Sequence, residues 1–97
     1  MKAELVYYEK RYFTESSFQE IKIWKIPESK DKPHGYKYSF VYIVDGERVI
    51  GYDNSEGKGD RKHYKGKEYP YKFQGLEKLW MDFMGDINQF KGESHEG

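Results

Sequence analysis

With 97 residues, the chain is long enough for one small domain with a modest core and too short for a second one. Its 17 basic and 17 acidic residues cancel, which argues against a protein that binds nucleic acid through bulk charge, so any such contact must be local. The absence of cysteine excludes disulfides and thiolate metal sites, and no apolar run has the length of a signal peptide or a membrane span, which predicts a cytoplasmic protein.

Two strands are predicted at the N-terminus. Residues 3–13 and 18–26 are rich in β-branched and aromatic side chains without helical periodicity, and a polar break separates them. The next segment, residues 27–35, holds two prolines and a glycine among charged residues. It cannot join the interior of a sheet, so we expect an exposed loop in which His34 is solvated.

The clearest strand prediction is a β-hairpin over residues 36–53. Its turn is Asp45-Gly46, and an Asp-Gly pair between two apolar runs is the strongest short-range hairpin signal. A regular two-residue turn would pair Tyr38 with Asp53. In that register Asp53 would leave the sheet on the face that carries the tyrosines.

An amphipathic helix is predicted over residues 76–90, because apolar residues recur there at helical spacing. The apolar stripe consists of Leu76, Leu79, Trp80, Phe83, Met84, Ile87 and Phe90. Lys91-Gly92 predicts the end of the helix, so we expect a disordered tail over residues 92–97 and a single domain over residues 1–91.

Together these elements predict an α+β fold. We expect a curved, largely antiparallel sheet of four to five strands, the fifth near residues 69–73, covered on one face by the C-terminal helix. Aromatic residues make up 19% of the chain, so they should supply much of the core. Those left on the uncovered face would favour a homodimer.

Residues 51–73, GYDNSEGKGDRKHYKGKEYPYKF, concentrate polar chemistry that no strand or helix would require. Glycines in the segment would let it fold back and aim several side chains at one point. The candidate catalytic residues are His63, Arg61, Asp60, Glu56 and Asp53. Because the segment is locally cationic, the candidate nucleic-acid-binding residues are Lys58, Lys62, Tyr64, Lys65 and Tyr52.

This set of residues suits RNA cleavage without a metal. That reaction needs a base for the 2′-OH proton, an acid for the leaving 5′-oxygen and a cation for the phosphorane charge. His63 can act as base or acid, Glu56 or Asp60 as the complementary carboxylate, and Arg61 as the charge clamp. The lysines would follow the RNA backbone, while a tyrosine would stack on a base.

Two other interpretations stay open from spacing alone. Asp53, Glu56, Asp60 and His63 have metal-binding side chains, but the basic residues between them would repel a cation, so we predict neither a metal nor a cofactor. The segment would also serve as a plain hydrated loop, or as a cationic surface that binds a protein or nucleic acid without catalysis.

The run YDNSEGKGDRKHYKGKEYPYKF, followed by an amphipathic helix, resembles the TumE-like toxin family of toxin–antitoxin systems. The resemblance covers most of residues 20–90. It implies a toxin that acts on RNA as an endoribonuclease and is neutralised by a cognate helix-turn-helix antitoxin. In that family a second histidine often precedes the final basic residue and histidine, whereas here the run is Asp60, Arg61, Lys62 and His63, which weakens any mechanism that needs two histidines.

Overall fold

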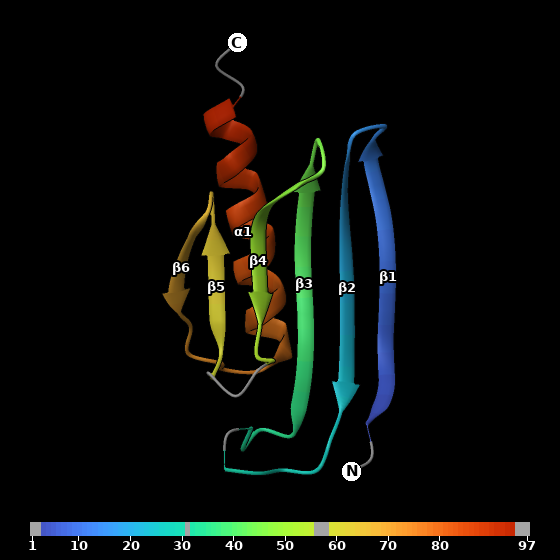
Figure 1. The fold of residues 1–97 in the computed structure, drawn as a ribbon, viewed down its shortest axis with the longest axis vertical. Coiled ribbons are helices and arrows are strands. Elements are labelled where there is room, and N and C mark those ends of the chain that lie inside the picture. The colour runs from blue at the N-terminus through green and yellow to red at the C-terminus, as the bar shows by residue number, and fades with distance from the viewer. Residues whose placement is uncertain (1–2, 31, 56–58, 95–97) are drawn as a thin grey trace.

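The computed structural model describes residues 3–30, 32–55 and 59–94, which form a six-stranded antiparallel sheet and one helix (Figure 1). The strands lie side by side in sequence order: β1 (Glu4–Thr14), β2 (Ser17–Lys25), β3 (Tyr36–Val44), β4 (Glu47–Asp53), β5 (Arg61–Tyr64) and β6 (Lys67–Pro70). The helix α1 (Leu76–Ser94) packs on one face. In these ranges no helix combines the length and the apolar composition needed to cross a membrane. The predicted α+β class is confirmed.

Two tight turns explain why neighbouring strands pair. Asp45 and Gly46 both have positive φ, 52° and 80°, as a type I′ hairpin turn requires, so the predicted turn is confirmed. Lys65 and Gly66 repeat the same geometry, with φ of 52° and 84°. This second turn joins β5 to β6.

Residues 51–73 contain more strand than the sequence predicted, which was the end of one hairpin and a fifth strand near residues 69–73. The segment contains the end of β4 and the whole β5–β6 hairpin, which extends the sheet beyond the predicted four to five strands. Its side chains are mostly polar, and β6 is exposed along its whole length. Such strands lack the apolar alternation by which a sequence reveals a strand.

A β-bulge lies in the pairing of β3 with β4. Tyr42 pairs with Ile50 and Ile43 pairs with Arg48, which makes Val49 the extra residue on β4. Because side chains alternate along a strand, a shift of one residue turns every later side chain to the other face.

The bulge reverses the predicted orientation of Asp53. In the structure Asp53 pairs with Ser39, not with Tyr38, so the prediction that Asp53 lies on the tyrosine-lined face was wrong. Tyr52 turns inward instead and joins the core. Asp53 therefore faces away from α1.

The core lies between α1 and the covered face of the sheet. Its buried residues are Ile21, Ile23, Tyr38, Phe40, Tyr42, Ile50 and Tyr52 from the strands and Leu79, Phe83 and Ile87 from the helix. The ring of Phe83 packs edge-on against Phe40, with centroids 5.3 Å apart, and against Tyr52 at 6.2 Å. The expectation of an aromatic core is confirmed.

Trp80 does not belong to this core, although the helical pattern placed it there. Its side chain is 38% exposed and lines a shallow apolar groove with Tyr7 and Ile23. The helix lies behind the β3–β5 side of the sheet, and β1 and β2 extend beyond it (Figure 1). Trp80 therefore sits at the margin of the covered area.

The helix continues past the predicted stop at Lys91-Gly92 and ends at Ser94. Glu93 explains the extension, because its carboxylate contacts Lys65 Nζ at 3.0 Å and accepts a hydrogen bond from the Tyr64 hydroxyl at 3.0 Å. The hydrogen bond from Lys65 is the main cause that lowers the pKa of Glu93. Of the predicted tail, residues 95–97 lie outside the described residues.

Three phenols of the covered face donate short hydrogen bonds to carboxylates. Tyr38 bonds to Asp60 at 2.6 Å and Tyr52 bonds to Asp86 at 2.5 Å. A third bond, from Tyr71 to Asp82, is 2.6 Å long. Burial raises the pKa of each phenol, and the bonded carboxylate raises it further.

We expect the domain to lose stability as the pH rises above 10.0, the ordinary pKa of these phenols. A group whose pKa is raised by folding stabilises the folded state fully at a pH below its pKa in the unfolded chain. This stabilisation is lost as the pH rises through its pKa in the folded protein. Urea unfolding followed by circular dichroism should show a falling midpoint in that window. The variant Tyr52→Phe should show a shallower fall, and an unchanged midpoint for the parent protein would contradict the argument.

Candidate active site

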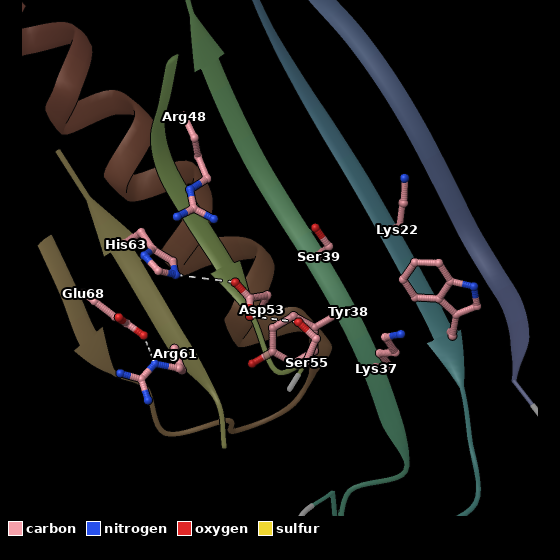
Figure 2. A pocket seen from close by; sticks show the side chains of 11 residues that line it. Lys22, Lys37, Tyr38, Ser39, Arg48, Asp53, Ser55, Arg61, His63 and Glu68 are labelled. Carbon is pink, nitrogen blue, oxygen red and sulfur yellow. Dashed lines mark hydrogen bonds and ion pairs between the residues drawn. The ribbon is translucent and has the colours of Figure 1, made fainter. Parts of the chain in front are cut away.

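A cavity of about 540 Å³ lies on the face of the sheet opposite α1 (Figure 2). Strands β2 to β6 and Ser55 supply the side chains that line it. The charged ones, apart from a histidine, are Lys22, Lys37, Arg48, Arg61, Asp53 and Glu68, a net charge of 4 − 2 = +2. The cavity is therefore cationic in a chain whose formal net charge is zero.

Strand pairing builds the floor of the cavity. Ser39 on β3 pairs with Lys22 on one side and with Asp53 on the other, and Asp53 pairs with Arg61. Directly paired residues share a face, so these four side chains form one row across β2 to β5.

His63 and Asp53 form the central contact of the cavity. His63 pairs with Gly51, two residues before Asp53, and its imidazole reaches diagonally across β4 (Figure 2). Nε2 of His63 lies 3.5 Å from Oδ2 of Asp53, and the two side chains are 17% and 25% exposed. The structure thus brings together two of the residues selected from the sequence, in a site that is sheltered yet open to a ligand.

Arg61 and Glu68 flank this contact. They form an ion pair across β5 and β6, and both line the cavity (Figure 2). Glu68 also pairs directly with His63, which places a second carboxylate on the same face. Sequence reasoning missed Glu68 because it did not predict β6 at this position.

Arg48 is a further cationic residue that sequence reasoning missed. Its side chain lies over Gly51, since a Cβ built on Gly51 would come within 2.9 Å of Arg48 Cδ. Gly51 is directly opposite His63, so the missing side chain leaves room for Arg48 beside the His63–Asp53 contact. A glycine inside a strand is itself a signal for a close approach, and here Arg48 makes that approach.

The family model described as toxin TumE matches residues 2–91. The chain belongs to the TumE toxin family. The matched range includes all six strands and every residue of the cavity. The chain is accordingly the toxin component of a toxin–antitoxin module, with an antitoxin as its partner. Searches of the curated proteins and of the solved structures find no match.

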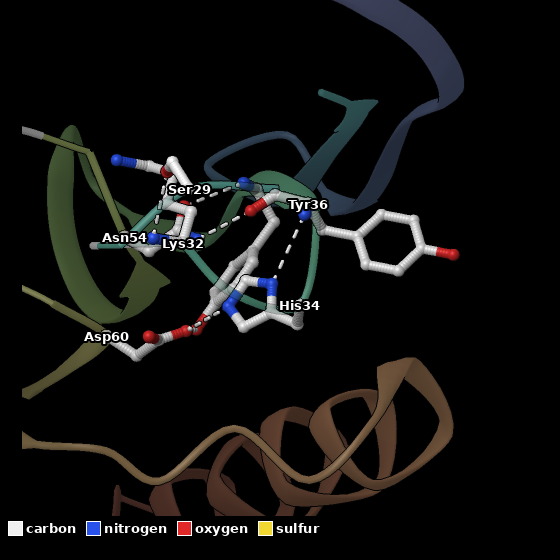
Figure 3. Close-up of polar contacts among 7 residues, drawn as sticks. Ser29, Lys32, His34, Tyr36, Asn54 and Asp60 are labelled. Carbon is white, nitrogen blue, oxygen red and sulfur yellow. Dashed lines mark hydrogen bonds and ion pairs between the residues drawn. The ribbon is translucent and has the colours of Figure 1, made fainter. Parts of the chain in front are cut away.

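In this TumE-family toxin Asp60 fastens a loop at the end of the sheet. Its carboxylate accepts a hydrogen bond from Tyr38 and lies 3.2 Å from Nε2 of His34 (Figure 3). His34 Nδ1 accepts a hydrogen bond from the backbone N–H of Tyr36, and its ring lies 4.0 Å from that of Phe73. The expectation of a solvated His34 was therefore wrong, and Asp60 does not line the cavity.

Four of the candidate nucleic-acid-binding residues lie in the described part of the toxin, and their side chains face the helix. Tyr52 and Lys62 both contact Asp86, the lysine Nζ at 3.0 Å, and Tyr64 and Lys65 both contact Glu93 of α1. Alternation along β5 sends Lys62 and Tyr64 to the face opposite Arg61 and His63.

Two of the selected residues, Glu56 and Lys58, lie outside the described residues. Within the described ranges no group of three or more histidine, aspartate or glutamate side chains is placed to hold a metal ion.

Proposed function

We propose that this toxin is a metal-independent endoribonuclease whose acid–base residue is His63, oriented by Asp53. The observation that carries the proposal is the 3.5 Å contact between the two side chains inside a cationic cavity. An imidazole held by a carboxylate is a common arrangement for proton transfer near neutral pH. The surrounding cations match the charge of an RNA backbone.

In the proposed reaction the 2′-oxygen attacks the adjacent phosphorus and the bond from phosphorus to the 5′-oxygen breaks. His63 takes the 2′-OH proton and, as imidazolium, returns it to the leaving 5′-oxygen. Asp53 holds the ring and favours the imidazolium that forms. The products are a 2′,3′-cyclic phosphate and a free 5′-OH.

Arg48 and Arg61 supply the positive charge that the phosphorane requires. A guanidinium presents several N–H donors in a plane and fits phosphate oxygens. Arg61 is oriented by Glu68, and Arg48 lies over Gly51. The charge-clamp role that the sequence assigned to Arg61 is thus shared by two arginines in the proposal.

Inducible expression in a bacterial host tests the proposal. Wild-type protein should arrest growth, and RNA from the arrested cells should carry new 2′,3′-cyclic phosphate ends. Purified protein should produce the same ends in the presence of a chelator. Growth arrest with intact RNA would overturn the ribonuclease and favour the alternative, a non-catalytic module whose cationic surface binds a protein or nucleic acid.

We propose two further features of the partners: the class of the antitoxin, from the family resemblance, and a homodimer of the toxin, from the structure. The family resemblance supports an antitoxin of the helix-turn-helix class and a cytoplasmic site of action. An adjacent reading frame for a small DNA-binding protein would check the class of the antitoxin.

The exposed edge strand β1 supports a homodimer, because Tyr7, Tyr8 and Tyr12 are 45%, 51% and 58% exposed there. Sedimentation of the isolated toxin and of its antitoxin complex would test whether the toxin forms a homodimer.

A further inference from the structure

Trp24 lies at the far end of the cavity from the His63–Asp53 contact. It is on β2, paired with Lys37 on β3, and both residues line the cavity. The Nζ of Lys37 is 5.3 Å from the centroid of the indole ring. Lys22, two residues earlier on β2, faces the same cavity, and both lysines lie across it from His63 (Figure 2).

The core does not explain this tryptophan. Its ring is on the face of the sheet away from α1, half-buried among charged side chains. A large aromatic ring that is framed by cations and open to a cavity is suited to stacking on a planar ligand. The lysines beside it are suited to an anionic group of the same ligand.

We propose that Trp24, Lys22 and Lys37 form a subsite for an unpaired base of single-stranded RNA and its phosphate. This inference rests on the proposed function for the identity of the nucleic acid. Trp24 is two strands away from Asp53, about 10 Å at the usual strand spacing. The stacked base therefore belongs to a nucleotide close to the one that is cleaved.

The single-stranded form follows from the geometry of stacking. The indole offers a flat face, and a base inside a duplex has both of its own faces covered by neighbouring bases, so an unpaired, unstacked base is the one suited to lie against it. Sequence reasoning gave this role to Tyr52 or Tyr64, but both contact α1 on the opposite face. Two aromatic residues, Trp24 and Tyr38, line the cavity with His63. Tyr38 is buried and its hydroxyl is bonded to Asp60, which leaves Trp24 as the ring that can stack on a base.

Fluorescence of Trp24 tests the subsite directly. The chain contains two tryptophans, so the double variant His63→Ala, Trp80→Phe leaves Trp24 as the reporter and removes the proposed cleavage. Titration with a short single-stranded RNA should quench the emission in a saturable way. A fully paired RNA of the same sequence should leave the emission nearly unchanged.

Affinity measurements in the His63→Ala background complete the test. Trp24→Ala should weaken binding of the single strand roughly 5- to 150-fold, as expected for one base–aromatic stack, whereas Trp24→Phe should retain most of it. Lys78→Ala, on α1, is the matched control and should bind as the parent does.

The outcomes separate the two proposals. Absence of quenching while the single strand binds, or equal quenching by the paired RNA, would overturn the subsite even if wild-type protein cleaves RNA. Saturable quenching by the single strand would support the subsite even if cleavage is absent, and in that case only the ribonuclease proposal falls.

Discussion

Replacing His63 by alanine should lower RNA cleavage about 10²–10⁴-fold, the usual cost of losing a general acid or base. The side chain is partly exposed and lies outside the core, so the variant should keep its circular dichroism spectrum and its melting temperature. Growth arrest on induction should disappear with the cleavage. Lys78→Ala, which removes a cation on α1 at the opposite face, should remain as toxic as wild type.

The variant Asp53→Asn tests whether the two residues act as a unit. It preserves the shape of the side chain but removes the charge that orients and stabilises the imidazolium. If Asp53 works through His63, the double variant His63→Ala, Asp53→Asn should cleave RNA no more slowly than His63→Ala alone. Independent, multiplicative losses would contradict the pairing, and full toxicity of folded His63→Ala would remove His63 from the mechanism.

The largest expected effect on stability is at Phe83. Its side chain is fully buried and packs against Phe40 and Tyr52, so Phe83→Ala should cost about 3–5 kcal/mol of unfolding free energy. A small domain has only about 5–15 kcal/mol in total, so the variant should be unfolded or nearly so at physiological temperature. Thermal and urea unfolding followed by circular dichroism would measure the loss.

Trp80→Ala is the matched control on the same helix. The sequence pattern gives both aromatic residues equal standing, but Trp80 is 38% exposed at the margin of the covered area. We expect a loss of about 1 kcal/mol and a cooperative unfolding transition. Equal losses for the two variants would show that the helix covers more of the sheet than the structure indicates.

The His63–Asp53 contact was predictable only in part. Both residues stood among the candidates because their side chains suit acid–base chemistry, and the resemblance to the toxin family pointed to the same segment. Asp60 and Glu56 were equally good carboxylates by composition and spacing. The structure distinguishes Asp53 from Asp60, since Asp53 contacts His63 while Asp60 bonds to Tyr38 and His34.

Local chemistry let the sequence by itself determine the Asp45-Gly46 turn, the amphipathic helix, the aromatic core and the α+β class. Each depends on neighbours a few residues apart: a turn on the φ its residues tolerate, a helix on the spacing of apolar side chains. The contact between Asp60 and His34 at the end of the sheet could not be predicted from such local patterns, because the two residues are 26 positions apart in the sequence.

Only the tertiary structure decided which face of the sheet carries the chemistry. Val49 is of a residue type that is common in strands, so its type does not mark it as the extra residue, yet it turns Asp53 from the covered face to the open one. The β5–β6 hairpin then adds His63 on that face, while Lys62 and Tyr64 turn to the helix. Because side chains alternate with a period of two, one inserted residue and one added hairpin are enough to assemble the cavity.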